Sequence, residues 1–226
     1  LVTNNEIYGK LSISSCSETV ISGNRIYSRG WSSNNAIAIS GNANLTIERN
    51  LLSSITTDGR GDIIIRNNTF VPWGHTDYAL HHDSDAVLDF YNNIIYGDGD
   101  CAIVKSRRER EASIHHNLYW DISEPFINVE PGESNIDRKP EFIGGRDYDY
   151  NLQVISPAID AGDPDSPEDP DGTRADIGCH FFDQRIDHNP VIVSRIRDYA
   201  KQGGSFTYIA RGTDDGDELT FGFADL

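Results

Sequence analysis

Residues 45–52 read LTIERNLL and residues 63–70 read IIIRNNTF, and both stretches place apolar residues around an asparagine in the same way. An apolar side chain stands three residues before the asparagine, and another stands two residues after it. The arrangement recurs along the first half of the chain, at Asn5, Asn24, Asn50, Asn68, Asn93 and Asn117. Because side chains alternate between the two faces of a strand, residues five and three before each asparagine share one face. Each unit therefore presents a short inward strand followed by a turn.

The spacing of these asparagines is 19, 26, 18, 25 and 24 residues. A strand-rich unit of this length cannot bury its apolar face until a neighbouring unit stacks on it. The sequence therefore predicts an all-β chain that forms a β-solenoid. A second, less regular strand is expected in each unit, at residues 11–14, 36–40, 78–82 and 102–105. The short third unit is expected to lose most of this second strand.

Asparagine suits such a corner for two reasons. It tolerates the left-handed backbone region, and its amide can hydrogen-bond to the equivalent amide of the units above and below. Ladders of this kind also form where identical strands stack. We expect one continuous ladder of asparagine side chains.

With this repeat, residues 1–184 resemble the right-handed parallel β-helix proteins, the architecture of pectate lyases. A second element adds to the resemblance: residues 151–164 read NLQVISPAIDAGDP, and residues 169–178 read DPDGTRADIG. It is similar to the SPAIDAG…DIG closing segment of many secreted bacterial β-helix proteins, although Cys179 and His180 depart from the usual small residue and aromatic. We call residues 151–184 the closing segment. The resemblance implies an irregular, acidic cap after the last unit.

Composition limits the classes of partner. The chain has 19 Lys and Arg against 36 Asp and Glu, a net charge of −17, which argues against nucleic acid and anionic membranes as partners. No apolar stretch is long enough to span a membrane. Cys16, Cys101 and Cys179 are odd in number and far apart, so no disulfide framework is expected.

After Gln184 the composition changes. Residues 185–226 resemble the opening of a cadherin-like or immunoglobulin-like β-sandwich, of which only about 40 residues are present where nearer 100 are usual. We expect two domains, 1–184 and 185–226. Because the sequence begins within a unit and ends within an apolar run, both are expected to be truncated parts of a longer protein.

Basic residues on two successive units form the first candidate site. If Leu80 and Val104 point inward, His81 stands over Lys105 and Asp83 over Arg107 on the outer face. In the uronate lyases that the fold resembles, a base removes a proton beside a carboxylate whose charge is neutralised. This implies Lys105 or His81 as the base and Arg107 or Arg108 as the stabilising cation, with Asp83 and Tyr78 contacting the sugar. The alternative is a solvated face with weak cross-strand pairs.

Two groups of residues suggest metals. Histidine and carboxylate ligands for zinc or another transition metal occur at His75, Asp77, His81, His82 and Asp83, with His115 and His116 one unit later. Adjacent strand residues point to opposite faces, which disfavours His81 and His82 as ligands of one ion. In the acidic cap, a calcium site is predicted from the carboxylates Asp163, Asp165, Asp169 and Asp171. The alternative is that these aspartates only form turns.

Two functions remain open. The first is an extracellular carbohydrate-associated protein, acting as a lyase or hydrolase on acidic polysaccharide, with calcium as the only expected cofactor. The second is a non-catalytic cell-surface or adhesion protein in which the β-helix is a stiff spacer. In both, the expected partner is a polysaccharide or cell-surface glycan, and a monomer is expected.

Overall fold

The computed structural model describes residues 1–27, 36–71, 78–83, 85–99, 102–105, 112–144, 149–188, 191–192 and 211–213. Within these ranges every regular element is a strand, so the all-β prediction is confirmed. Among the described residues no helix is long and apolar enough to cross a membrane.

Most strands belong to two sheets whose pairings are all parallel. The seven-stranded sheet contains, in order, β17 (Ile136–Asp137), β15 (Leu118–Ile122), β12 (Ile94–Gly99), β9 (Thr69–Phe70), β6 (Leu51–Leu52), β4 (Arg25–Tyr27) and β2 (Glu6–Tyr8). The ten-stranded sheet contains β1 (Val2–Thr3), β3 (Leu11–Ser22), β5 (Ile37–Glu48), β7 (Ile55–Arg60), β8 (Asp62–Arg66), β10 (Tyr78–His82), β11 (Val87–Tyr91), β13 (Ala102–Lys105), β14 (Ala112–His115) and β16 (Phe126–Ile127).

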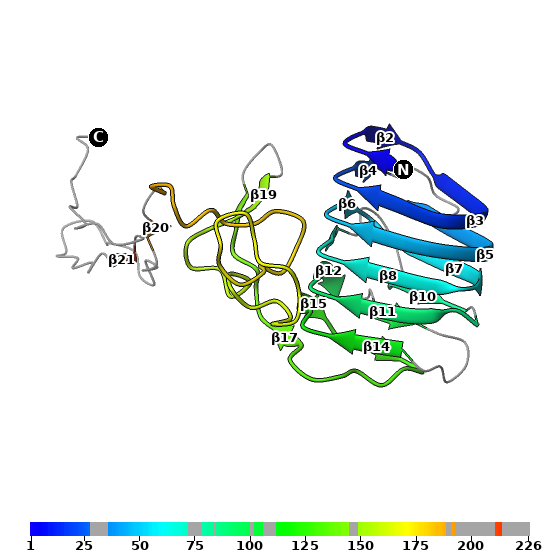
Figure 1. Cartoon of the computed structure of the whole chain (residues 1–226). Helices are drawn as coiled ribbons and strands as arrows, with labels where there is room; N and C mark the ends of the chain where they lie inside the picture. Colours follow the sequence, from blue (N-terminus) through cyan, green and yellow to red (C-terminus); the bar gives the residue numbers. More distant parts are fainter. Residues whose placement is uncertain are drawn as a thin grey trace.

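The long strands β3 and β5 divide the ten-stranded sheet into two rows. The first half of β5 pairs with β7, and its second half pairs with β8. Row 1 continues through β10, β13 and β16, and row 2 through β11 and β14. In each unit the chain passes from the seven-stranded sheet to row 1, then to row 2, and then reaches the next asparagine. Figure 1 shows the resulting stack of strands.

One apolar core runs through the stack. In row 2 the buried residues Ile47, Ile65 and Phe90 lie in register on successive strands. The seven-stranded sheet contributes buried residues two positions after the asparagines, such as Leu52 and Phe70. These side chains belong to a single cluster, which confirms the inward positions predicted from the repeat.

The asparagine ladder is present and continuous. Each side-chain Nδ2 donates to the Oδ1 of the next asparagine over 3.0–3.1 Å, from Asn5 through to Asn117. Each Oδ1 also accepts the backbone N–H of the preceding rung, and Asn24 to Asn117 are buried. The ladder therefore satisfies polar groups that the corner would otherwise bury without partners.

The left-handed residue of each corner is not the ladder asparagine, so that part of the expectation is wrong. The residue immediately before each asparagine has φ between 50° and 67°, at Asn4, Gly23, Arg49, Asn67, Asn92, His116 and Ser134. This residue makes the bend, while the asparagine that follows turns its amide inward. Asparagine and glycine are frequent there because they adopt this region at the least steric cost.

The structure adds one rung and one strand to the prediction. Asn117 donates to Asn135 Oδ1 over 3.1 Å, which makes Asn135 a seventh rung. Its flanking positions hold Gly132 and Asp137 in place of apolar residues, so the sequence pattern missed it. The short third unit keeps its second strand as β7, contrary to expectation, because Gly61 alone connects β7 to β8.

The closing segment lies along the side of the stack. Its residues Ala158, Ile177 and Phe182 pack with Ile94 and Leu118, which are on the outer face of the seven-stranded sheet. The yellow and orange chain beside β12, β15 and β17 in Figure 1 is this segment. Outer-face residues in register along this sheet are Glu6, Arg25, Leu51, Thr69, Ile94, Leu118 and Ile136. The column is charged in the first two units and largely apolar from Leu51 onward, where the segment covers it.

Two short antiparallel pairs complete the described structure. They are β18 (Phe142–Gly144) with β19 (Asp149–Leu152), and β20 (Val191–Ile192) with β21 (Gly212–Thr213). The second pair supplies the only strands among the described residues of the expected β-sandwich, so the division into domains at Gln184 stays a prediction.

Candidate functional site

The predicted basic site on row 1 is described only in part. The register places Leu80 opposite Val104 and His81 opposite Lys105, as expected from the repeat. His81 is partly exposed between two buried neighbours, and its ring lies 5.1 Å from that of Tyr78. Asp83 donates its backbone N–H to Thr57 O over 3.1 Å.

The remaining atoms of that site lie outside the described residues. They are the Lys105 side chain and all of Arg107 and Arg108. The catalytic roles of Lys105, His81 and Arg107 therefore stay predictions.

The four aspartates of the predicted calcium site occupy separate places in the closing segment. Asp171 accepts bonds from Thr173 and Gln184, within its own loop. Asp169 is buried, and its Oδ1 lies 3.2 Å from Arg49 Nη2. Asp163 Oδ1 accepts the N–H of the exposed Asp165 over 3.0 Å. In the described part of the chain these four do not form one group of potential ligands, and calcium binding there stays a prediction.

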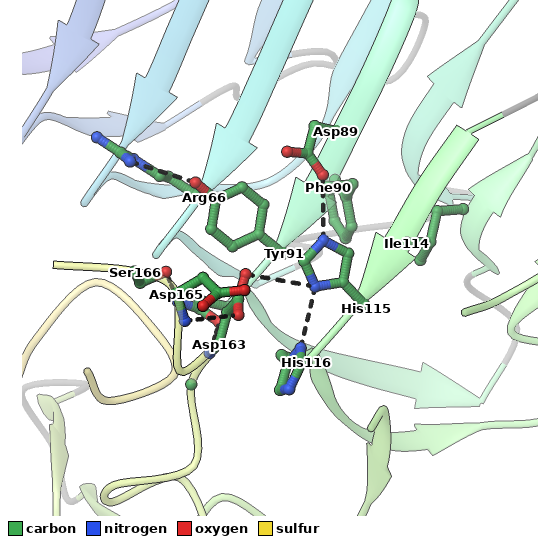
Figure 2. Close-up of polar contacts among 12 residues, drawn as sticks. Arg66, Asp89, Phe90, Tyr91, Ile114, His115, His116, Asp163, Asp165 and Ser166 are labelled. Atoms are coloured by element: carbon green, nitrogen blue, oxygen red, sulfur yellow. Dashed lines mark hydrogen bonds and ion pairs between the residues drawn. The ribbon is translucent and has the colours of Figure 1, made fainter. Parts of the chain in front are cut away.

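Instead, one of these aspartates lies beside two histidines. Within the described ranges, His115, His116 and Asp163 are the one group of three His, Cys, Asp or Glu residues that could share a metal ion, with ligand atoms within 4.8 Å of one another. The Nδ1 atoms of His115 and His116 are 3.0 Å apart, and His115 Nδ1 is 3.8 Å from Asp163 Oδ2. Figure 2 shows the nitrogen of His115 that meets both the Asp163 carboxylate and the His116 ring.

The left-handed corner explains how neighbouring histidines reach the same point. His115 is the last residue of β14, and His116 follows with φ 51°. Alternation between faces holds only for extended backbone, so the bend at His116 turns its ring back toward that of His115. Burial lowers the pKa of His116 below its ordinary value, the largest effect on it, partly opposed by the Asp163 carboxylate.

Two contacts orient the His115 ring. Its Nε2 lies 3.2 Å from Asp89 Oδ1, and its plane stacks on Tyr91 at 5.1 Å and 5°. A carboxylate only accepts hydrogen bonds, so Nε2 carries a proton, and whenever the ring is neutral its Nδ1 carries the lone pair. In the absence of an ion, His116 then donates its Nδ1–H to His115.

The closing segment is held to this same corner by residues at the left-handed positions. Asn92 accepts the N–H of Asp163 over 2.7 Å and donates to Ser166 Oγ over 3.1 Å. Asn67 donates to Asp176 O over 2.9 Å. With the Arg49–Asp169 ion pair, three successive units thus supply polar contacts to the segment.

The SPAIDAG…DIG residues join the two halves of the segment. Gly162 donates to Ala175 O over 2.8 Å, and a Cβ at Gly162 would lie only 2.5 Å from that oxygen. The Asp176 carboxylate accepts the N–H groups of Asp160 and Phe182. Burial, reinforced by nearby acidic groups, raises the pKa of Asp176 to about 7, although these two hydrogen bonds lower it. These motif residues are therefore structural.

A cleft of about 640 Å³ opens where the closing segment stops covering the seven-stranded sheet. Its lining residues are Asn4, Gly23, Asn24, Arg25, Arg49, Leu51, Asn151, Glu168, Pro170, Cys179, His180 and Phe181. This volume is in the range of small-molecule sites. Two arginines, a histidine and an aromatic ring thus share one concave surface with a single carboxylate, that of Glu168.

The charges of this cleft differ in how firmly they are held. Arg49 is engaged by Asp169, whereas Arg25 is exposed and forms no ion pair with any described residue. The pKa of His180 is lowered, chiefly by burial and next by the positive charge of Arg25. At neutral pH the cleft therefore holds one available guanidinium beside a neutral imidazole.

Comparison with protein-family models, with curated protein sequences and with solved structures gave no match to this chain. The class of protein therefore rests on the fold: an all-β chain with extended parallel sheets. Sequence reasoning considered His115 and His116 but had no means of pairing them with Asp163. The cleft was not predicted from the sequence. One signal for its position was present, because the outer-face residue changes from the charged Arg25 to the apolar Leu51 between successive strands of the seven-stranded sheet.

Proposed function

We propose that this chain is part of an extracellular right-handed parallel β-helix that binds an acidic carbohydrate in the cleft beside the closing segment. The β-helix is supported by three rows of parallel strands around one core, and by the strong preference of parallel crossovers for the right hand. The observation that carries the binding function is a cleft with two arginines in a chain of net charge −17.

The chemistry of the lining favours a uronate over a neutral sugar. A guanidinium donates two parallel hydrogen bonds to a carboxylate, and Arg25 has no competing partner among the described residues. The Phe181 ring supplies apolar surface for a sugar face. Since the protein as a whole repels polyanions, binding requires a site that offers an available cation, as Arg25 does here.

A lyase activity is the second candidate, and one observation favours it. His180 has a lowered pKa and stands in a cleft with Arg25, so a neutral imidazole faces the place where a uronate carboxylate is expected to bind. A base beside a neutralised carboxylate is what elimination requires. The pair of His81 and Lys105 on row 1 is the alternative location for this chemistry. If neither acts, the chain is the non-catalytic surface protein or spacer considered above.

Binding is tested by calorimetric titration of the 226-residue chain with oligogalacturonate, oligoalginate and a neutral dextran oligomer. We expect binding of an acidic oligomer and none of dextran. Arg25→Gln should weaken the binding about 10-fold or more, because a charge-assisted pair is lost. Arg60→Gln is the matched control, since Arg60 is an exposed arginine away from the cleft. Equal affinity in the wild type and Arg25→Gln, or no binding of any acidic oligomer, would refute the proposal.

The lyase candidate is tested by following unsaturated products in the ultraviolet with pectate, alginate and glycosaminoglycans, with and without a calcium chelator. Activity lost in His180→Asn places the base in the cleft, and activity lost only in His81→Asn places it on row 1. No product from any polymer rules out the lyase and leaves carbohydrate binding as the function.

A further inference from the structure

We infer that His115, His116 and Asp163 bind one divalent transition-metal ion, with zinc as the best candidate, and that this ion fastens the closing segment to the corner of the stack. The inference is independent of carbohydrate binding. It rests on three side chains from two distant parts of the sequence whose electron-rich atoms face a common point.

The distances fit a tetrahedral ion. Zinc bonds of about 2.0–2.1 Å to imidazole nitrogens place two such nitrogens about 3.3 Å apart. The two Nδ1 atoms are 3.0 Å apart, and Asp163 Oδ2 is 3.8 Å from His115 Nδ1. Shifts of a few tenths of an ångström in the side chains would bring all three to bonding distance. Three protein ligands leave the fourth position of a tetrahedral site to water.

His115 is already oriented as a metal ligand. Its Nε2–H donates to Asp89, and this leaves the Nδ1 lone pair directed at the common point. A carboxylate behind a ligating histidine is the usual arrangement in zinc sites, where it fixes the tautomer and strengthens the ligand. The ring is further held by its stacking on Tyr91. His116 becomes the second ligand by taking the tautomer with its proton on Nε2, so that its Nδ1 also offers a lone pair.

The Asp163 ligand is positioned by bonds that leave one oxygen available. Its backbone N–H is fixed by Asn92, and its Oδ1 accepts from Asp165. Oδ2 lies 3.8 Å from His115 Nδ1, and in the tautomer with the proton on Nε2 both atoms offer lone pairs to a cation between them. All three ligating residues are partly buried, so water competes only weakly for the ion.

The donor set selects the class of ion. Two imidazoles and one carboxylate suit zinc and its neighbours, whereas calcium requires six to eight oxygen ligands. The ion predicted here is therefore different in chemistry from the calcium expected in the acidic cap. By joining β14 to the closing segment, it would stabilise the same segment that forms one wall of the cleft.

The test uses the 226-residue chain after dialysis against EDTA, titrated calorimetrically with zinc chloride. One equivalent of zinc should bind, and saturating zinc should raise the melting temperature. His116→Asn is the main variant, because asparagine already occupies the equivalent left-handed position as Asn67 and Asn92. It should fold and bind zinc more than about 100-fold more weakly.

Two further variants and one control complete the design. Asp163→Asn keeps the acceptor for Asp165 but loses the ligand charge, so zinc affinity should fall strongly. Asp89→Asn should weaken zinc about 10- to 100-fold, as expected for the group that orients a ligand. His81→Asn, an outward histidine on row 1, should bind zinc like the wild type.

Three outcomes would overturn the inference. The most direct is the absence of stoichiometric zinc binding by the wild type. Undiminished zinc binding by both His116→Asn and Asp163→Asn would place the ion elsewhere. Calcium binding that competes with zinc at this site would contradict the assigned class of ion. The melting temperature of each variant in EDTA must match that of the wild type, which separates lost ligands from lost folding.

Discussion

The inner and outer sides of one corner of this molecule follow different rules. On the inner side, each of seven units presents an asparagine that makes the same contacts as its neighbours. On the outer side the residue type varies from unit to unit, and Arg49, Asn67, Asn92 and His116 each contact the closing segment differently. The inner contacts define the stack, and the outer contacts define where a ligand or an ion can bind.

The ladder is expected to carry the larger share of stability. Asn68 is fully buried and bonds to Asn50, Asn93 and two backbone carbonyls. Asn68→Ala should lower the free energy of unfolding by about 4 kcal/mol, because several buried groups each lose a partner at about 1–3 kcal/mol. Asn5→Ala, at the exposed first rung, should cost less than about 1 kcal/mol. Urea unfolding followed by circular dichroism measures both, and equal losses would mean that the ladder is not a buried network.

The outer contacts should each contribute less. Arg49→Gln leaves the buried Asp169 carboxylate without its cation, and about 2 kcal/mol of stability should be lost. The loss stays below that of a fully buried pair because Arg49 is itself partly exposed. The double variant Arg49→Gln, Asp169→Asn should recover part of this lost stability, because the buried charge is then removed as well.

The matched control for this ion pair is Arg60→Gln. It breaks the exposed pair with Asp85, whose atoms are 4.0 Å apart, and should cost less than about 1 kcal/mol. A larger effect at Arg60 than at Arg49 in urea unfolding would contradict the role given to the closing segment.

The stability of the closing segment should also change with pH. The pKa of Asp176 is raised to about 7, so the unfolded chain loses this proton from about pH 4 while the folded chain keeps it. The contribution of Asp176 to stability therefore falls between about pH 4 and 7, by at most about 1.4 kcal/mol per pH unit, and is constant above. Asp176→Asn removes this slope. The unfolding free energy of the wild type minus that of the variant, measured from pH 4 to 8, should fall up to about pH 7 and then stay constant. A difference that grows with pH would show that the carboxylate is stabilised as the ion.

The repeating features of the fold were predicted from the sequence. Asparagines flanked by apolar residues gave the inward faces, the parallel rows and the register of Leu80 with Val104. The sequence pattern missed Asn135 because Gly132 and Asp137 replace the flanking apolar residues there. It also missed β7, because a single glycine linked it to β8 and no loop marked the boundary.

The candidate sites were harder to predict, for a physical reason. The cleft and the group of His115, His116 and Asp163 each depend on contacts between the stack and the closing segment, and these occur once, so no period reveals them. His115 and His116 were recognised as possible ligands, but their partner Asp163 was assigned to a calcium site with other aspartates. The bend at His116 that lets both rings reach one point follows from its place in the corner, which only the register of the whole stack reveals.

The docking of the closing segment along the corner is the claim on which the cleft and the metal site both depend. Amide hydrogen exchange measured by NMR tests it most directly at Asp163, Gly178 and Cys179, whose N–H groups bond to Asn92 Oδ1, Asn92 O and Thr69 Oγ1. We predict slow exchange at all three amides, with protection factors close to those of the ladder amides of Asn68 and Asn93. Exchange of these three amides at the rate of an unprotected peptide, while the ladder amides stay protected, would show that the closing segment is not docked along the corner.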